Sequence, residues 1–140
     1  MKAALDVGAD VDTRNRDFET PLGDAAFEGN TACVMYLVAH GADINELTSI
    51  FGSPLEAAIY RDNMDCVRFL VAHGAAVNGR PNGWQFPVIN AAEDGHLDCV
   101  KFLISKGADV NAINQDGWTA LTVAHDPKII VALKAAGAKE

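Results

Sequence analysis

Several kinds of functional site are absent from this sequence of 140 residues. Its three cysteines are an odd number, which argues against a closed disulfide framework, and no C-x-x-C or H-x-x-x-H pair is present to favour a metal site. Neither a G-x-S-x-G motif nor a Walker-type phosphate loop occurs. We therefore expect that the chain is not an enzyme, has no catalytic residues, and uses no metal ion or other cofactor.

Long apolar runs and an excess of positive charge are also missing. No apolar stretch approaches the roughly 18 residues of a membrane span, and the first residues are too polar for a signal-peptide core. We therefore expect a cytoplasmic protein that contacts no membrane. The chain has 11 basic and 19 acidic residues, for a net charge of −8. Because phosphate binding needs clustered cations, we expect no nucleic-acid partner, and a protein with a basic surface is favoured.

What the sequence does contain is a regular period, which separates Cys33, Cys66 and Cys99 by equal intervals. The same spacing separates three prolines and three glycines, which are Pro21, Pro54, Pro87, Gly41, Gly74 and Gly107. A fixed period of about 33 residues, held by several residue types at once, indicates a stack of similar supersecondary units. In such a stack each cysteine is expected to be a small buried side chain with no chemical role.

Each repeat carries signals for two short helices. Thr20 and Ser53 precede prolines and can accept hydrogen bonds from the free N–H groups of a first helix. Glu56 follows Ser53 by three residues, which predicts a capping box, whereas Phe86 in the third repeat cannot cap. A second, apolar helix then ends in His40-Gly41 and its copies, where glycine suits the left-handed turn. Helices of about ten residues are unstable alone, so neighbouring repeats must bury their apolar faces.

Three short motifs recur in phase along the chain. The segment Gly41-Ala42-Asp43-Ile44-Asn45 and its copy at 107–111 have the pattern G-A-D-V-N, Thr20-Pro21-Leu22 has T-P-L, and 95–98 is close to G-H-L-E. This arrangement resembles the ankyrin repeat over essentially the whole chain. The resemblance implies an all-α fold, an ankyrin-repeat α-solenoid of stacked helix-turn-helix units with β-hairpin-like loops. The family's usual histidine after T-P-L is replaced here by Gly23, Glu56, Ile89 and Thr122.

We predict a single ankyrin-repeat domain over 1–140. It comprises a partial N-terminal repeat (1–11), full repeats at 12–44, 45–77 and 78–110, and a shortened C-terminal repeat at 111–140. Lys134 replaces an apolar residue of the earlier repeats, so the last helix is expected to cap the stack with a polar outer face. The chain is expected to be a monomer. Its apolar patch of Ala32, Met35 and Ala39 marks the N-terminal end as a place for association with further repeats or a second subunit.

In proteins that this chain resembles, partners bind a concave side made from the loop tips and the exposed side of each first helix. Carrying those positions over predicts the partner-binding residues Arg16, Asp17, Phe18, Glu19, Phe27, Glu28, Ile50, Phe51, Tyr60, Arg61, Trp84, Gln85, Glu93, Asp94, Asp116 and Trp118. The carboxylates expected on or near this side are Asp17, Glu19, Asp24, Glu28, Glu56, Glu93, Asp94 and Asp116. Aromatic side chains among carboxylates favour a groove for a basic partner.

The aromatic residues Phe18, Phe51 and Trp84 recur at a loop position where the family usually has glycine. Two interpretations stay open for them: exposed anchors for a partner, or side chains packed under the loops. Tyr60 and Trp118 are harder to bury. The predicted function is a non-catalytic protein–protein interaction module. The alternatives are a structural segment of a longer ankyrin protein and a small acidic neutraliser, of the immunity or inhibitor type, of a basic toxin or enzyme.

Overall fold

A computed structural model describes residues 20–47, 52–78 and 86–139 of the chain. These ranges contain eight helices and no strand, which confirms the predicted all-α class. The chain divides into two compact units, unit 1 (residues 1–75) and unit 2 (residues 76–140). The boundaries of the individual repeats stay a prediction.

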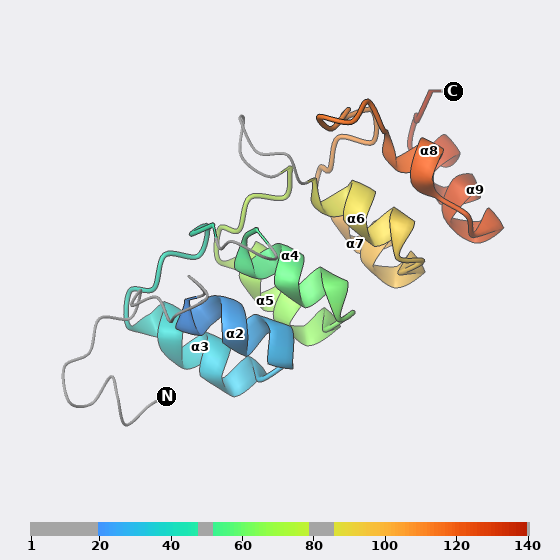
Figure 1. Cartoon of the computed structure of the whole chain (residues 1–140). Helices are drawn as coiled ribbons and strands as arrows, with labels where there is room; N and C mark the ends of the chain where they lie inside the picture. The colour runs from blue at the N-terminus through green and yellow to red at the C-terminus, as the bar shows by residue number, and fades with distance from the viewer. Residues whose placement is uncertain (1–19, 48–51, 79–85, 140) are drawn as a thin grey trace. The chain divides into compact units, whose positions relative to one another are not determined.

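The described residues of unit 1 form two helical hairpins. The first is α2 (Pro21–Glu28) with α3 (Thr31–Ala39), and the second is α4 (Pro54–Tyr60) with α5 (Met64–Ala72). The helices within each hairpin pack together, while α2 packs along α4 and α3 along α5, so that the hairpins lie side by side (Figure 1). Leucines and valines with no exposed surface fill the space between them: Leu22, Val34, Leu37, Leu55, Val67 and Leu70.

Unit 2 repeats this arrangement with a shorter second hairpin. Helices α6 (Pro87–Glu93) and α7 (Leu97–Ser105) form the first hairpin, and α8 (Ala120–Val123) and α9 (Pro127–Ala135) form the second. Here α6 packs on α7 and α8, and α9 packs on α7 and α8 (Figure 1). Helix α8 has four residues because Ala124 is extended (φ −73°, ψ 130°) and ends it.

The first helices begin as the capping signals predict. The Thr20 hydroxyl accepts from the Gly23 N–H at 3.1 Å. Ser53 and Glu56 form the expected capping box, in which each side chain accepts from the other residue's N–H at 3.4 Å. Phe86 makes no cap hydrogen bond, also as expected. Because a cap satisfies N–H groups that a helix start leaves unpaired, α6 begins with less local support than α4.

Asparagines at one position of the repeat tie the loop between two repeats to the end of a following second helix. In unit 1 the side-chain amide of Asn45 donates to the Gly74 carbonyl at 3.2 Å. In unit 2 the amides of Asn78 and Asn111 donate to the carbonyls of Gly107 and Gly137, at 3.4 and 3.1 Å. The last asparagine of the G-A-D-V-N pattern therefore ties its loop to the end of the next repeat's second helix. The sequence shows that the asparagine recurs, and the structure shows that its side chain donates to a glycine carbonyl.

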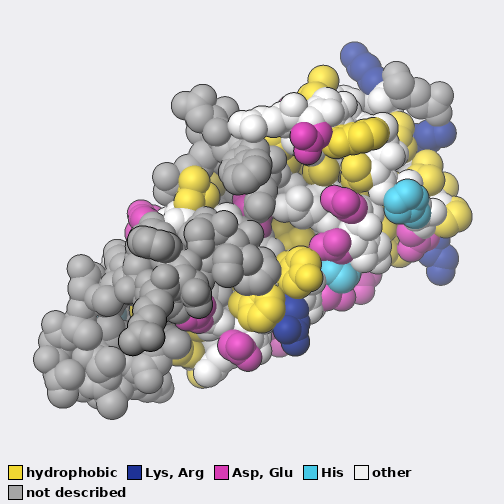
Figure 2. All heavy atoms as spheres, viewed as in Figure 1, with side chains coloured by type: hydrophobic (Ala, Val, Ile, Leu, Met, Phe, Trp, Pro, Cys, Tyr) yellow, Lys and Arg dark blue, Asp and Glu magenta, His cyan; other side chains and the backbone are white. Residues whose placement is uncertain are grey.

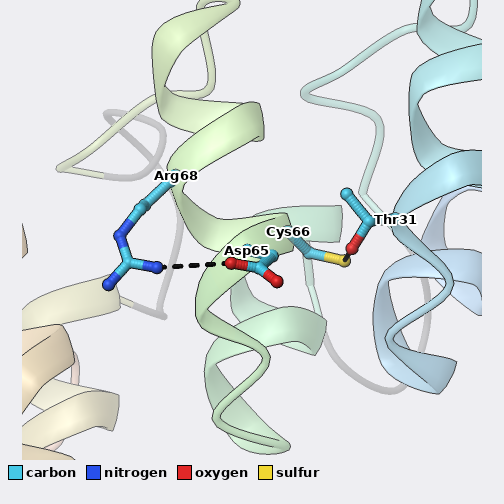
Figure 3. A network of polar contacts seen from close by, with 4 residues as sticks. All are labelled: Thr31, Asp65, Cys66 and Arg68. Atoms are coloured by element: carbon cyan, nitrogen blue, oxygen red, sulfur yellow. Dashed lines mark hydrogen bonds and ion pairs between the residues drawn. The ribbon is translucent and has the colours of Figure 1, made fainter.

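The cysteines occupy the core positions that the period predicts. Cys66 and Cys99 have no exposed surface, Cys33 has 7%, and all three are free thiols. The Sγ atom of Cys66 lies 3.4 Å from the Thr31 hydroxyl on the neighbouring hairpin (Figure 3). Burial raises the pKa of the Cys66 thiol, and the contact with Thr31 opposes that shift in part. A buried thiol with a raised pKa is a poor nucleophile, so Cys66 serves packing.

Helix α5 carries charge only on its exposed side. Arg68 and Asp65, both exposed, form an ion pair of 3.4 Å one turn apart (Figure 3). Their charges therefore cancel locally, and such a surface pair contributes less than about 1 kcal/mol to stability.

The recurring histidines have a structural role at the ends of α3 and α5. The Nδ1 atom of His40 lies 2.8 Å from the Tyr36 carbonyl oxygen, and that of His73 lies 2.9 Å from the Phe69 carbonyl oxygen. Each imidazole also stacks on the ring of the same residue, with centroids 4.0 Å apart. The repeated histidine therefore completes the last turn of its own helix.

Candidate functional site

The ends of α2 and α4 carry an ordered aromatic cluster, which consists of Phe27, Tyr60 and Arg61. Phe27 and Tyr60 hold the same position in consecutive repeats and stack, with ring centroids separated by 6.2 Å and planes inclined by 18°. The guanidinium carbon of Arg61 lies 4.8 Å from the centroid of the Phe27 ring. Tyr60 is 56% exposed. The two repeats of unit 1 thus place two rings and a cation together at the surface.

Asn63 holds the two helix ends that carry this cluster. Its side-chain amide donates to the carbonyls of Ala26 and Phe27, at 2.8 and 3.1 Å. Gly29 ends α2 in the left-handed region (φ 74°), and a Cβ atom there would lie 2.9 Å from the Asn63 Oδ1. Glycine therefore leaves the space that the Asn63 amide occupies. The bond to its carbonyl keeps Phe27 in place beside Tyr60.

This arrangement is prepared for binding before any partner arrives. A cation over an aromatic ring at an exposed site contributes about 0.5–1 kcal/mol, and an offset aromatic pair contributes a similar amount. Side chains that are already held in one conformation lose less entropy on association. The cluster is therefore suited to contact an apolar or aromatic group of another molecule.

In unit 2 the corresponding helix end is acidic. Glu93 and Asp94 close α6 at the positions that Tyr60 and Arg61 hold in α4, one repeat earlier, and both carboxylates are exposed. Two adjacent exposed carboxylates attract cations and repel anions over roughly a Debye length. The same place in the repeat thus provides rings and a cation in unit 1 and negative charge in unit 2.

Trp118 lies in the one loop tip between repeats that falls wholly within the described residues. The Asn114 Oδ1 accepts from the N–H groups of Asp116 and Trp118 at 3.0 and 2.9 Å, and its N–H donates to the Trp118 carbonyl at 3.0 Å. Gly117 adopts the left-handed conformation (φ 82°) that this tight turn requires. Trp118 is 48% exposed, and Asp116 beside it is exposed as well.

Comparison with family models gives an assignment that agrees with this geometry. A model for ankyrin repeats (3 copies) matches residues 1–81, and a model for ankyrin repeats (many copies) matches residues 88–130. The first match alone covers more than half of the 140 residues. The chain belongs to the ankyrin-repeat family. No curated protein matches it in sequence. Ankyrin repeats generally mediate protein–protein interaction and are typically non-catalytic.

Half of the predicted partner-binding residues of this ankyrin-repeat protein can be placed. The described ones are Phe27, Glu28, Tyr60, Arg61, Glu93, Asp94, Asp116 and Trp118. The others lie outside the described residues, and they are Arg16, Asp17, Phe18, Glu19, Ile50, Phe51, Trp84 and Gln85. The placed residues are exposed except Phe27, which is half-buried. Figure 2 shows hydrophobic side chains beside acidic ones on the viewed face.

Two residues at this site correct or extend the sequence analysis. Glu56, counted there with the acidic side, is only 5% exposed and contributes no surface charge. Its burial raises the pKa of the carboxyl from its ordinary value of 4.5 to about 7, against the opposing hydrogen bonds from Ser53. Asn63 was missed. The sequence does contain a signal for Asn63. The pairs Gly29-Asn30 and Asp62-Asn63 separate the first helix from the second in their repeats, and each pair ends in asparagine.

Two other kinds of site are not found in the described part of the ankyrin-repeat protein. In residues 20–47, 52–78 and 86–139, no three histidine, cysteine, aspartate or glutamate side chains lie where they could hold a metal ion. None of the helices in the same ranges is long and apolar enough to cross a bilayer.

Proposed function

We propose that each unit of this ankyrin-repeat protein offers a surface for a partner protein: the cluster at the ends of α2 and α4 in unit 1, and the end of α6 with the loop tip at Trp118 in unit 2. The observation that carries the proposal is the aromatic cluster: Tyr60 is 56% exposed while stacked on Phe27, which Arg61 covers. Tyrosine, tryptophan and arginine are the residues most enriched among those that dominate binding energy. An ordered and exposed cluster of these types supports a contact surface better than a solvated helix end.

The chemistry of the two surfaces indicates the chemistry of the partner. In unit 1, Tyr60 offers a ring that would pack on apolar or aromatic side chains. In unit 2, Trp118 offers such a ring, and Glu93, Asp94 and Asp116 offer negative charge. A basic partner surface would be steered toward these carboxylates, which increases the association rate and makes it sensitive to salt. We therefore propose a partner with lysine or arginine side chains next to an apolar one.

The two alternatives from the sequence differ in what they require of these surfaces. A small acidic neutraliser of a basic toxin or enzyme would use the same carboxylates and is a special form of the proposal. A purely structural segment of a longer ankyrin protein would need no occupant for the exposed rings. The cluster of Phe27, Tyr60 and Arg61 favours the binding function over the structural one.

Removal of both rings of the cluster tests the proposal. We expect Phe27→Ala with Tyr60→Ala to weaken partner binding by about 30-fold or more, since central aromatic contacts are worth about 2 kcal/mol or more. The partner would first be captured from cells of the source organism with the wild-type chain and identified by mass spectrometry. It would then be purified and titrated by calorimetry against both forms.

Met35→Ala provides the control, because Met35 is 49% exposed and belongs to α3, whereas the cluster lies at the ends of α2 and α4. It should bind like the wild type, and circular dichroism should show helical content close to the wild-type level for both variants. Binding that survives loss of the two rings but not loss of Met35 would contradict the proposal and place the contact on the outer helices.

A further inference from the structure

A second surface with the opposite charge lies on the outer helices of unit 2. Between α7 and α9, which pack against each other (Figure 1), there is a groove of about 380 Å³. Its lining consists of Leu97, Lys101, Pro127, Lys128, Val131 and Ala132. Val131 is 67% exposed, the largest exposure among the exposed large hydrophobic side chains of the described residues. We call this surface the α7–α9 groove.

The repeat pattern shows how the groove differs from its counterpart in unit 1. On α5, Asp65 and Arg68 pair at 3.4 Å and cancel each other's charge. The shortened last repeat places Lys128 at the position of Asp65, and Val131 at the position of Arg68. The outer helix thus reverses one charge and replaces the other by an exposed apolar side chain.

The resulting surface is positive on an otherwise acidic chain. The charged side chains that line the groove are Lys101 and Lys128, and no carboxylate lines it, whereas the whole chain has a net charge of −8. Within the described residues, Lys101 and Lys128 make no ion pair, and both are exposed. Lysine stems can cover apolar surface while their ammonium groups stay in water. Two unpaired ammonium groups beside an apolar floor match a ligand that is apolar in the middle and acidic at its margins.

We propose that the α7–α9 groove binds an amphipathic helix with acidic flanks, supplied by a second partner protein. Apolar side chains of that helix enter between Leu97 and Val131, and its carboxylates pair with Lys101 and Lys128. A groove between two packed helices is a common receptor for the apolar face of a third. Charge complementarity selects this occupant, because a basic helix would meet two uncompensated lysines. The chain would then hold a basic partner on one surface and an acidic partner on another.

A charge-swap titration of the complete chain tests the groove. The probe is a fluorescein-labelled synthetic 18-residue peptide, with leucines on one helical face and glutamates on both flanks. A second peptide has lysines in place of the glutamates. We expect the glutamate peptide to bind, and Lys101→Glu with Lys128→Glu to weaken it at least tenfold while gaining affinity for the lysine peptide. Val131→Ser should weaken both forms of binding. Fluorescence anisotropy measures the wild type and each variant with both peptides.

The control reverses the same number of charges elsewhere in unit 2. Lys134→Glu with Lys139→Glu changes two exposed lysines outside the groove and should alter affinity less than threefold. Phe27→Ala with Tyr60→Ala should leave peptide binding unchanged, which separates this proposal from the first. Equal losses of affinity for the glutamate peptide in the control and groove variants would overturn the proposal. Equal binding of both peptides by the wild type would also overturn it. Salt-sensitive self-association that Lys101→Glu with Lys128→Glu removes would instead identify a second copy as the occupant.

Discussion

In unit 1 the first helices end in Phe27 and Tyr60, stacked with Arg61, whereas in unit 2 the helix α6 ends in Glu93 and Asp94. These residues hold equivalent places in repeats of the same length, so the backbone brings them to equivalent positions on the surface. The repeat dictates where a side chain is exposed, and leaves its chemistry free. The difference therefore shows where binding properties can vary without a cost to the fold.

A second pair of equivalent positions shows the same freedom inside the core. Glu56 and Ile89 both follow the proline and apolar residue that open a first helix, and they are 5% and 2% exposed. Ile89 is suited to burial. Glu56 is retained with a capping box to Ser53 and a pKa raised to about 7 by its surroundings. Folding of unit 1 thus has a pH-dependent free-energy cost at Glu56, and the corresponding residue of unit 2, Ile89, has none.

The largest expected effect comes from removing this buried acid. The folded chain binds a proton at Glu56 more tightly than the unfolded chain, because the pKa rises from 4.5 to about 7 on folding. The contribution of protonated Glu56 to the free energy of unfolding is fully present below pH 4.5. It is lost as the pH rises through 7, and the free energy of unfolding then falls by about 3 kcal/mol in total. We expect Glu56→Gln, which retains the capping geometry, to be more stable than the wild type at pH 8 by about that amount. Urea unfolding at pH 4.5, 6 and 8 measures it.

The exposed Glu93 is the control for this comparison. Glu93→Gln, which removes a carboxylate from the exposed end of α6, is unfolded with urea at the same three pH values. Parallel pH profiles for Glu56→Gln and the wild type would mean that folding does not raise the pKa of Glu56.

The second effect concerns the glycines that end the first helices. Gly29 and Gly95 have nearly the same φ, 74° and 77°, but a Cβ atom on Gly29 would lie 2.9 Å from the Asn63 Oδ1, whereas one on Gly95 would contact nothing within 4 Å. The Asn63 amide cannot move without loss of its bonds to Ala26 and Phe27. We expect Gly29→Ala to cost about 2–3 kcal/mol and Gly95→Ala about 1 kcal/mol, the cost of the left-handed backbone alone.

Thermal unfolding of both glycine variants beside the wild type provides the measurement. Equal losses of stability in the two variants would show that the Asn63 side chain can move aside at no cost in free energy. Its role in holding Phe27 would then be wrong.

The smallest effect tests whether the two helix ends differ in energy as well as in chemistry. Arg61→Ala removes the cation above Phe27 and should lower the free energy of unfolding by about 0.5–1 kcal/mol. Asp94→Ala, at the equivalent position of unit 2, should change it by at most about 0.5 kcal/mol, the usual range for exposed substitutions. Urea unfolding at low and high salt measures both. A loss for Asp94→Ala as large as that for Arg61→Ala would remove the energetic distinction between the units.

Much of the fold follows from interactions within a few residues, and these the sequence predicts well. Thr20, Ser53 and the prolines after them indicate where helices begin, and the recurring glycines indicate where they end. The exposure of Tyr60 and Trp118 was also predicted, from their phase in the repeat. The burial of Glu56 was not, because a capping box reveals the local bond and gives no information about what covers the side chain. The role of Asn63 was not predicted either, because its hydrogen-bond partners, the carbonyls of Ala26 and Phe27, belong to the preceding repeat.

By itself, the sequence determined the repeating unit, the order of its helices and the family to which it belongs. These depend on the constant period of the repeat and on capping bonds between residues close together in the chain. Only the tertiary structure decided that Phe27 stacks on Tyr60 beneath Arg61, that Glu56 is held at a raised pKa, and that Lys101 and Lys128 flank one groove. The stacking and the groove depend on distances between side chains from different repeats, and the pKa of Glu56 depends on its burial. Such distances arise when the hairpins pack, and no local signal specifies them.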